Sequence, residues 1–158
     1  MEIDAFLADS VAVAEGKLFV QGAGWNIVWT NAVPARHPRI GIGALIHVPY
    51  TATNQLHEFS IRIVDQDENQ LSLAAAPPGV DALDGQITEL KGQFNMGRPP
   101  ALTPGDTQIV PLAVNLDGIE FPTSNMYSVV ISIDGTVLKR LPIRVQLVAN
   151  PLTTSPQR

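Results

Sequence analysis

The chain of 158 residues contains no cysteine. Disulfide bonds and thiolate zinc sites are therefore excluded, but a domain of this length buries about 70% of its unfolded surface and needs no such cross-links. Charged residues are also scarce, at 16% of the chain, where a soluble domain usually has about 25%. Fifteen acidic residues outnumber ten basic ones, so we expect no basic surface and no nucleic-acid partner.

The start of the chain lacks both a basic leader and a long apolar run. Glu2 and Asp4 lie among the first residues, and Asp9 interrupts the apolar residues that follow them. This pattern predicts neither a signal peptide nor a membrane span. We therefore expect a cytoplasmic protein that does not cross a membrane.

Motifs for catalysis and cofactor binding are missing as well. The run from Gly22 to Ile27 begins like a dinucleotide-binding fingerprint, but isoleucine stands where the third glycine belongs and no helical pattern follows. No Gly-x-Ser-x-Gly elbow occurs, and His37, His47 and His57 do not lie at a local metal-binding spacing. We therefore expect no enzymatic activity, no catalytic residue and no cofactor.

Short apolar runs with a period of two are what the sequence does contain. The clearest is the stretch from Asn125 to Val148, where two alternating arms flank a single Asp134-Gly135 turn. Each arm has one apolar face and one polar face, as expected for a half-buried strand. The stretch predicts a β-hairpin at the centre of an all-β domain.

The register of this hairpin depends on the type of its turn. A two-residue turn would place Arg140 on the apolar side, unless a bulge near Lys139-Arg140 corrected the pairing. A three-residue loop with a G1 bulge at Gly135 instead pairs Ile131 with Val137 and keeps the apolar faces together. We expect the three-residue loop, with a positive φ at Gly135.

Several further stretches predict strands, and they are separated by Gly, Pro and Asp-Gly signals. They cover residues 5–14 and 17–20, which form a first hairpin, and residues 25–29, 40–48, 56–64, 87–96 and 107–116, with an Asp-Gly turn at 117–118. About nine or ten such strands predict a single antiparallel β-sandwich, immunoglobulin-like or C2-like, with a jelly roll as the alternative. We expect this domain to span residues 1–149 and a flexible tail to cover residues 150–158.

One acidic loop is a candidate metal site. Asp65, Asp67 and Asn69 present oxygen ligands at alternate positions, which suits Ca²⁺. The loop is not an EF-hand, because its sixth and twelfth positions are Gln70 and Ala76 instead of glycine and glutamate. We favour a solvated hairpin turn without a metal, since Asp and Asn are common turn residues.

The two tryptophans are the candidate interaction residues. Trp25 and Trp29 would share one face of a strand, about 13 Å apart, with Ile27 between them. If exposed, this face would be a platform for a sugar ring or a partner protein. We favour a buried core face, because large aromatic side chains are mostly buried.

Five short segments resemble an uncharacterised bacterial family of small all-β proteins that is classed only as a domain of unknown function. They are residues 4–9, 16–18, 22–25, 133–135 and 141–145, which together span most of the chain. The resemblance implies a single small bacterial domain. The matching residues are turn and core types, so the resemblance assigns no activity to any position.

The function that these observations favour is a non-enzymatic structural or protein-interaction domain. Low charge, the lack of site chemistry and the abundance of strands all fit a domain that self-associates or is a subunit of a larger assembly. Its expected partner is therefore another protein or a second copy. The alternative is a Ca²⁺- or carbohydrate-binding module of C2-like or lectin-like type.

Overall fold

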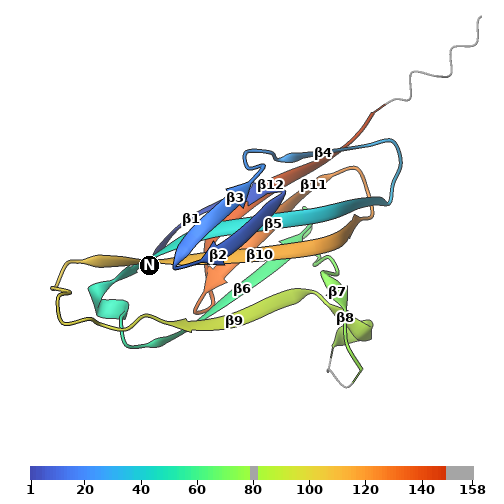
Figure 1. Cartoon of the computed structure of the whole chain (residues 1–158). Helices are drawn as coiled ribbons and strands as arrows, with labels where there is room; N and C mark the ends of the chain where they lie inside the picture. The colour runs from blue at the N-terminus through green and yellow to red at the C-terminus, as the bar shows by residue number, and fades with distance from the viewer. Residues whose placement is uncertain (79–81, 149–158) are drawn as a thin grey trace, which may run out of the picture.

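The computed structural model describes residues 1–78 and 82–148, and the predicted tail at 150–158 lies outside the described residues. The described chain is all-β, with twelve strands and two short 3₁₀ helices, η1 (Tyr50–Ala52) and η2 (Leu83–Gly85) (Figure 1). The predicted all-β class is therefore confirmed. Both helices of the described residues have only three residues, so neither can span a membrane.

The strands form two larger sheets and two small ones (Figure 1). The three-stranded sheet has the order β1 (Glu2–Ala8), β5 (Ala35–Pro49), β10 (Thr107–Phe121). The five-stranded sheet has the order β4 (Ile27–Thr30), β12 (Thr136–Leu147), β11 (Met126–Ile133), β6 (Leu56–Val64), β9 (Glu89–Asn95). The small sheets pair β2 (Ser10–Ala14) with β3 (Lys17–Gln21), and β7 (Ala74–Ala75) with β8 (Gln86–Ile87).

The inner faces of the two larger sheets share one apolar core. Alternate residues of β5, from Ile40 to Val48, are almost completely buried, because each inward position of this central strand is covered by both neighbouring strands and by the opposite sheet. Alternate residues of β11, from Tyr127 to Ile133, form the matching face of the five-stranded sheet. The predicted strand at 40–48 therefore lies within β5, which begins five residues earlier.

The pairing of β4 departs from the antiparallel prediction. β4 runs parallel to β12, with Ile27 beside Arg144 and Trp29 beside Gln146. Parallel neighbours need a long connection, and most of the domain lies between these two strands in the sequence. β4 therefore joins the five-stranded sheet as an outer strand, at the rim of the molecule in Figure 1.

The predicted turn at residues 117–118 is wrong, because β10 continues unbroken to Phe121. Ile119 pairs with His37, so β5 provides partners along the whole length of β10. Gly118 takes a positive φ of 67° within the strand, which glycine allows at little cost. Asp117 is also held to the neighbouring strand by Arg39, whose Nε lies 2.6 Å from its Oδ1.

The hairpin between β11 and β12 has a two-residue turn, so the three-residue loop predicted from the sequence is wrong. Ile133 pairs with Thr136, and Asp134 and Gly135 have φ values of 50° and 76°. The positive φ expected at Gly135 is confirmed. A bulge beyond Ile131 then shifts the register, so that the apolar residues of both arms still face the core.

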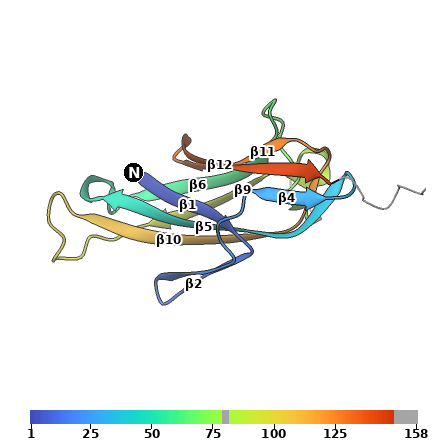
Figure 2. The ribbon, with the colours of Figure 1, turned by 90° about the horizontal axis from the view of Figure 1, so that it is seen from above.

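The β2–β3 hairpin lies across the outer face of the three-stranded sheet and projects from it (Figure 2). Asn115 of β10 fastens it, because its side chain accepts a hydrogen bond from the Val11 N–H (3.0 Å) and donates one to the Val11 carbonyl (2.8 Å). Gly41 of β5 lies beneath the start of this hairpin. A Cβ atom at Gly41 would be only 3.0 Å from the Ala8 carbonyl oxygen. The absence of a side chain at Gly41 therefore allows this close approach.

Candidate functional site

The two tryptophans lie in different environments. Trp25 precedes β4, is partly buried and packs its ring against His37, with ring centroids 5.1 Å apart. Its indole N–H is buried and has no hydrogen-bond partner among the described residues. Burial lowers the pKa of His37, so this imidazole favours its neutral form.

Trp29 is 63% exposed, and Ile27 beside it on β4 is 38% exposed. The buried residue of this strand is Val28 between them, at 7%. The predicted core face for Trp29 and Ile27 is therefore wrong. The period of two was correct, but pairing with β12 turns the opposite face of β4 toward the core.

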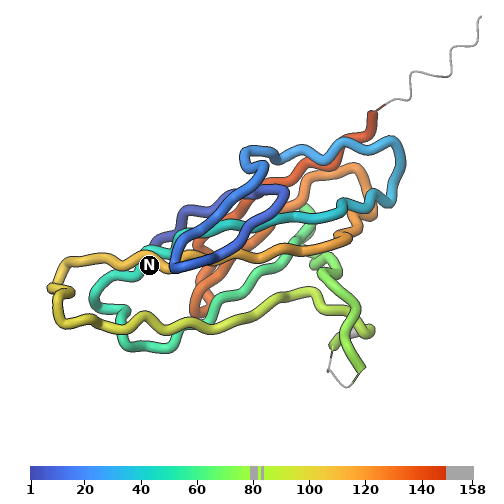
Figure 3. The backbone as a smooth tube through the Cα atoms, viewed as in Figure 1, coloured from blue at the N-terminus to red at the C-terminus, as the bar shows by residue number. Residues whose placement is uncertain are grey.

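One uncharged segment supplies much of the exposed apolar surface. Residues 18–35 contain no Asp, Glu, Lys or Arg, and they include five of the eleven large apolar side chains that are exposed in the described chain. The five are Phe19, Val20, Ile27, Trp29 and Val33. We call residues 18–35 the uncharged segment, which runs from β3 through residues 22–26 into β4 and on to β5 (Figure 3).

The acidic loop after β6 is organised around Asp65. Asp65 Oδ1 accepts hydrogen bonds from the backbone N–H groups of Asp67 (2.8 Å) and Asn69 (2.9 Å), and Oδ2 accepts one from the Asn69 side chain (3.0 Å). These contacts, chiefly that with the Asn69 side chain, lower the pKa of Asp65. The carboxylate thus stabilises its own turn, in the manner typical of Asp in turns.

Among the described residues, the candidate ligands Asp65, Asp67 and Asn69 do not join other acidic side chains in a metal-binding cluster. Within residues 1–78 and 82–148, no three His, Cys, Asp or Glu side chains converge as a metal site would require. Asp106, in the turn before β10, accepts hydrogen bonds from the Thr103 N–H (2.7 Å) and hydroxyl (2.8 Å) and so stabilises its own turn.

The buried His57 pairs with the exposed carboxylate of Asp134, a contact that sequence spacing could not reveal. His57 is 4% exposed, and its Nδ1 lies 2.7 Å from Asp134 Oδ2 while its Nε2 lies 2.7 Å from the Ala52 carbonyl oxygen. Both ring nitrogens are engaged, so His57 has no free nitrogen for a substrate. The pair links β6, η1 and the β11–β12 turn, which meet only in the folded chain.

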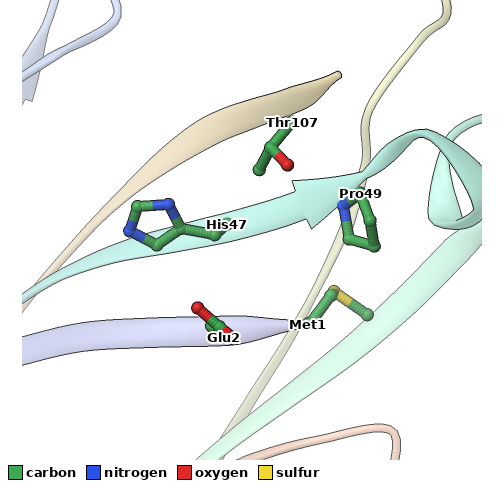
Figure 4. A pocket seen from close by; sticks show the side chains of 5 residues that line it. All are labelled: Met1, Glu2, His47, Pro49 and Thr107. Carbon is green, nitrogen blue, oxygen red and sulfur yellow. The ribbon is translucent and has the colours of Figure 1, made fainter. Parts of the chain in front are cut away.

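A second histidine borders an open hollow of about 320 Å³ at the end of the three-stranded sheet (Figure 4). Met1, Glu2, His47, Pro49 and Thr107 line it, and they come from β1, β5, β10 and the residue before β1. His47 Nε2 lies 2.9 Å from Asp4 Oδ2 on the neighbouring strand, and this exposed pair bridges β5 and β1. The hollow has polar groups but no arrangement of nucleophile and base that defines a reaction.

Another hollow, of about 330 Å³, lies where β1 approaches β12. Its lining is mainly apolar and includes Phe6, Trp25, Leu141 and Pro142. Trp25 is thus part of the boundary between the two larger sheets, whereas Trp29 is on the outer surface. The two candidate interaction residues are not brought together in one site.

Comparison with known proteins identifies the family of the chain but not its function. No curated protein and no solved structure matches it. The family of unknown function DUF6941 matches residues 3–146, which extend from the second residue of β1 to the last but one of β12 and so cover the strands of both larger sheets. The resemblance noted in the sequence is therefore confirmed at the level of the family, and the chain belongs to DUF6941, a family of unknown function.

Proposed function

We propose that this protein is a non-enzymatic protein-interaction domain that self-associates or is a subunit of a larger assembly. The observation that supports this proposal is the uncharged segment, residues 18–35, with its five exposed apolar side chains. Soluble proteins usually protect outer strands with charged side chains, and apolar surface left without them favours contact with another chain.

The position of these side chains adds support. Phe19 and Val20 lie on the projecting β2–β3 hairpin, and Ile27 and Trp29 lie on the outer strand β4. Both elements are at the periphery, where a partner could reach them without opening the core. Within the proposal, the two larger sheets form a sandwich of immunoglobulin-like or C2-like type, and the cytoplasmic location stays a prediction of the sequence.

Light scattering tests the proposal directly. At concentrations from about 1 to 100 µM, we expect the mean mass to rise above the 17.0 kDa of one chain as weak complexes form. A mass of 17.0 kDa throughout this range would contradict self-association.

The sugar-binding alternative has one observation in its favour, the exposed ring of Trp29. A sugar site also needs polar groups that converge beside the ring. Trp29 does not line any of four hollows on the described part of the chain, which include the two described above. A glycan that raises the melting temperature of the wild-type protein but not of Trp29→Ala would favour this alternative over protein interaction.

A further inference from the structure

The edge of β4 that faces away from β12 has no strand beside it among the described residues, and it presents a short, symmetric set of backbone hydrogen-bonding groups. The Arg144 N–H donates to the Asn26 carbonyl (2.8 Å) and the Val148 N–H to the Thr30 carbonyl (2.8 Å), so the even-numbered residues of β4 face β12. Because alternate residues of a strand direct these groups to opposite sides, the N–H and C=O groups of Ile27 and Trp29 face away from β12. They lie one residue on either side of Val28.

This spacing is self-complementary. If two β4 strands lie antiparallel about a two-fold axis at Val28, Ile27 of each copy stands opposite Trp29 of the other. The outward N–H and C=O groups then form two hydrogen-bonded pairs, with four hydrogen bonds in all. The same register places the exposed Ile27 and Trp29 side chains next to each other across the junction, which is a favourable pairing of an aromatic and a β-branched residue.

The charge of this edge also suits a second copy. β4 and its flanking residues belong to the uncharged segment, so two identical edges can approach without like-charge repulsion or the burial of an unpaired charge. A strongly acidic or basic partner would find no opposite charge on β4 itself. A copy of the same strand matches it in hydrogen bonding, shape and charge.

We propose that β4 is a homodimer interface, in which two copies join their five-stranded sheets through antiparallel β4 strands. This inference rests on the proposed function and names the partner as a second copy of the chain. An isologous contact of this kind closes after two copies, because each β4 edge occupies the other. The exposed edge is thereby covered and cannot recruit further chains.

The available area indicates a weak dimer. The exposed apolar residues on or beside β4 present about 400 Å² per copy, or about 800 Å² for two copies, given the usual area of such side chains. They are Ile27, Trp29, Val33, Leu147 and Val148. Stable complexes bury about 1,200 to 2,000 Å², so we expect dissociation in the micromolar range and a mass that depends on concentration.

Charge substitutions at the two facing positions test both the location and the register. In the double variant Ile27→Lys/Trp29→Lys, every contact of residue 27 with residue 29 of the other copy becomes a pair of positive charges. In the double variant Ile27→Glu/Trp29→Glu, each of these contacts becomes a pair of negative charges. We expect each variant alone to remain at 17.0 kDa at about 100 µM, where the wild type is dimeric. An equimolar mixture should recover dimers, because lysine then faces glutamate at every position.

Leu56→Lys is the matched control, because Leu56 is 64% exposed at the start of β6 and is outside the proposed interface. It should dimerise like the wild type. Circular dichroism and melting curves identify folded variants, and recovery of dimers in the mixture also requires that both variants be folded.

Three outcomes would contradict the proposals, and each contradicts a different part of them. A monomeric wild type overturns both this inference and self-association. Dimers that persist in both charged variants overturn the β4 interface but leave self-association standing. Folded, monomeric variants that do not recover dimers on mixing overturn the antiparallel register.

Discussion

At the scale of single residues, His57 is held at both of its ring nitrogens. Its pKa is raised, chiefly because the ring donates a hydrogen bond to the Ala52 carbonyl and further because it contacts the Asp134 carboxylate. The pKa of Asp134 is lowered, first by His57 and then by the Glu58 N–H, which donates to Oδ1 at 3.0 Å. Both shifts favour an imidazolium paired with a carboxylate.

The pair predicts a pH dependence of stability. A histidine with a raised pKa stabilises the fold fully below its unfolded pKa of about 6.5, and this contribution is lost as the pH rises through the folded pKa. We expect the melting temperature to fall from pH 6 upward, and to fall less steeply in Asp134→Asn, whose neutral side chain keeps the turn but not the charge. An equal slope in both proteins between pH 6 and pH 9 would contradict this assignment.

At the scale of elements, the β2–β3 hairpin depends on one side chain from a different sheet. Asn115 of β10 pairs with both backbone polar groups of Val11, a residue that is only 3% exposed. Its amide thus replaces the neighbouring strand that the hairpin lacks at this point. A carboxylate there could accept the Val11 N–H but could not donate to the Val11 carbonyl.

Removal of this amide should loosen the hairpin and leave the larger sheets intact. In Asn115→Ala, we expect a loss of about 1 to 3 kcal/mol in the local opening free energy, because the buried polar groups of Val11 lose their partners. Native-state hydrogen exchange should show faster exchange for residues 10–21, with little change in β6 and β11. Asn115→Asp is the control, and it should have an effect of similar sign because the donor is lost.

At the scale of the whole molecule, both larger sheets depend on one core. Ile42 of β5 and Ile131 of β11 are fully buried in the same apolar cluster, on opposite sides of it. Neither sheet can bury its apolar face without the other. The hairpin residue Phe19, by contrast, is 54% exposed.

The shared core predicts a single cooperative unfolding transition. Ile42→Ala and Ile131→Ala should each reduce the free energy of unfolding by about 2 to 5 kcal/mol, as expected for cavities in a packed interior. Tryptophan fluorescence and circular dichroism in urea should give one coincident midpoint for each variant. Two separate transitions would show that the sheets unfold independently, and Phe19→Ala should leave the midpoint almost unchanged.

The sequence by itself determined the positions of most strands, because a period of two is a local property of neighbouring residues. It did not separate β1 from β2, which the predicted run at 5–14 joined across Asp9. The predicted strand at 56–64 has the same bounds as β6, and the turn at Glu15-Gly16 joins β2 to β3 as expected. The positive φ at Gly135 was also predictable, since an Asp-Gly pair between alternating arms demands it.

The tertiary structure decided the rest, for reasons that involve residues far apart in the chain. The hairpin register was set by a two-residue turn together with a bulge, and Asp134 of that turn is held by Glu58 and His57 of β6. The buried face of β4 was set by its pairing with β12, which left Trp29 exposed. A period of two in the sequence shows that the two faces of a strand differ, but only the partner strands and the opposite sheet determine which face is buried.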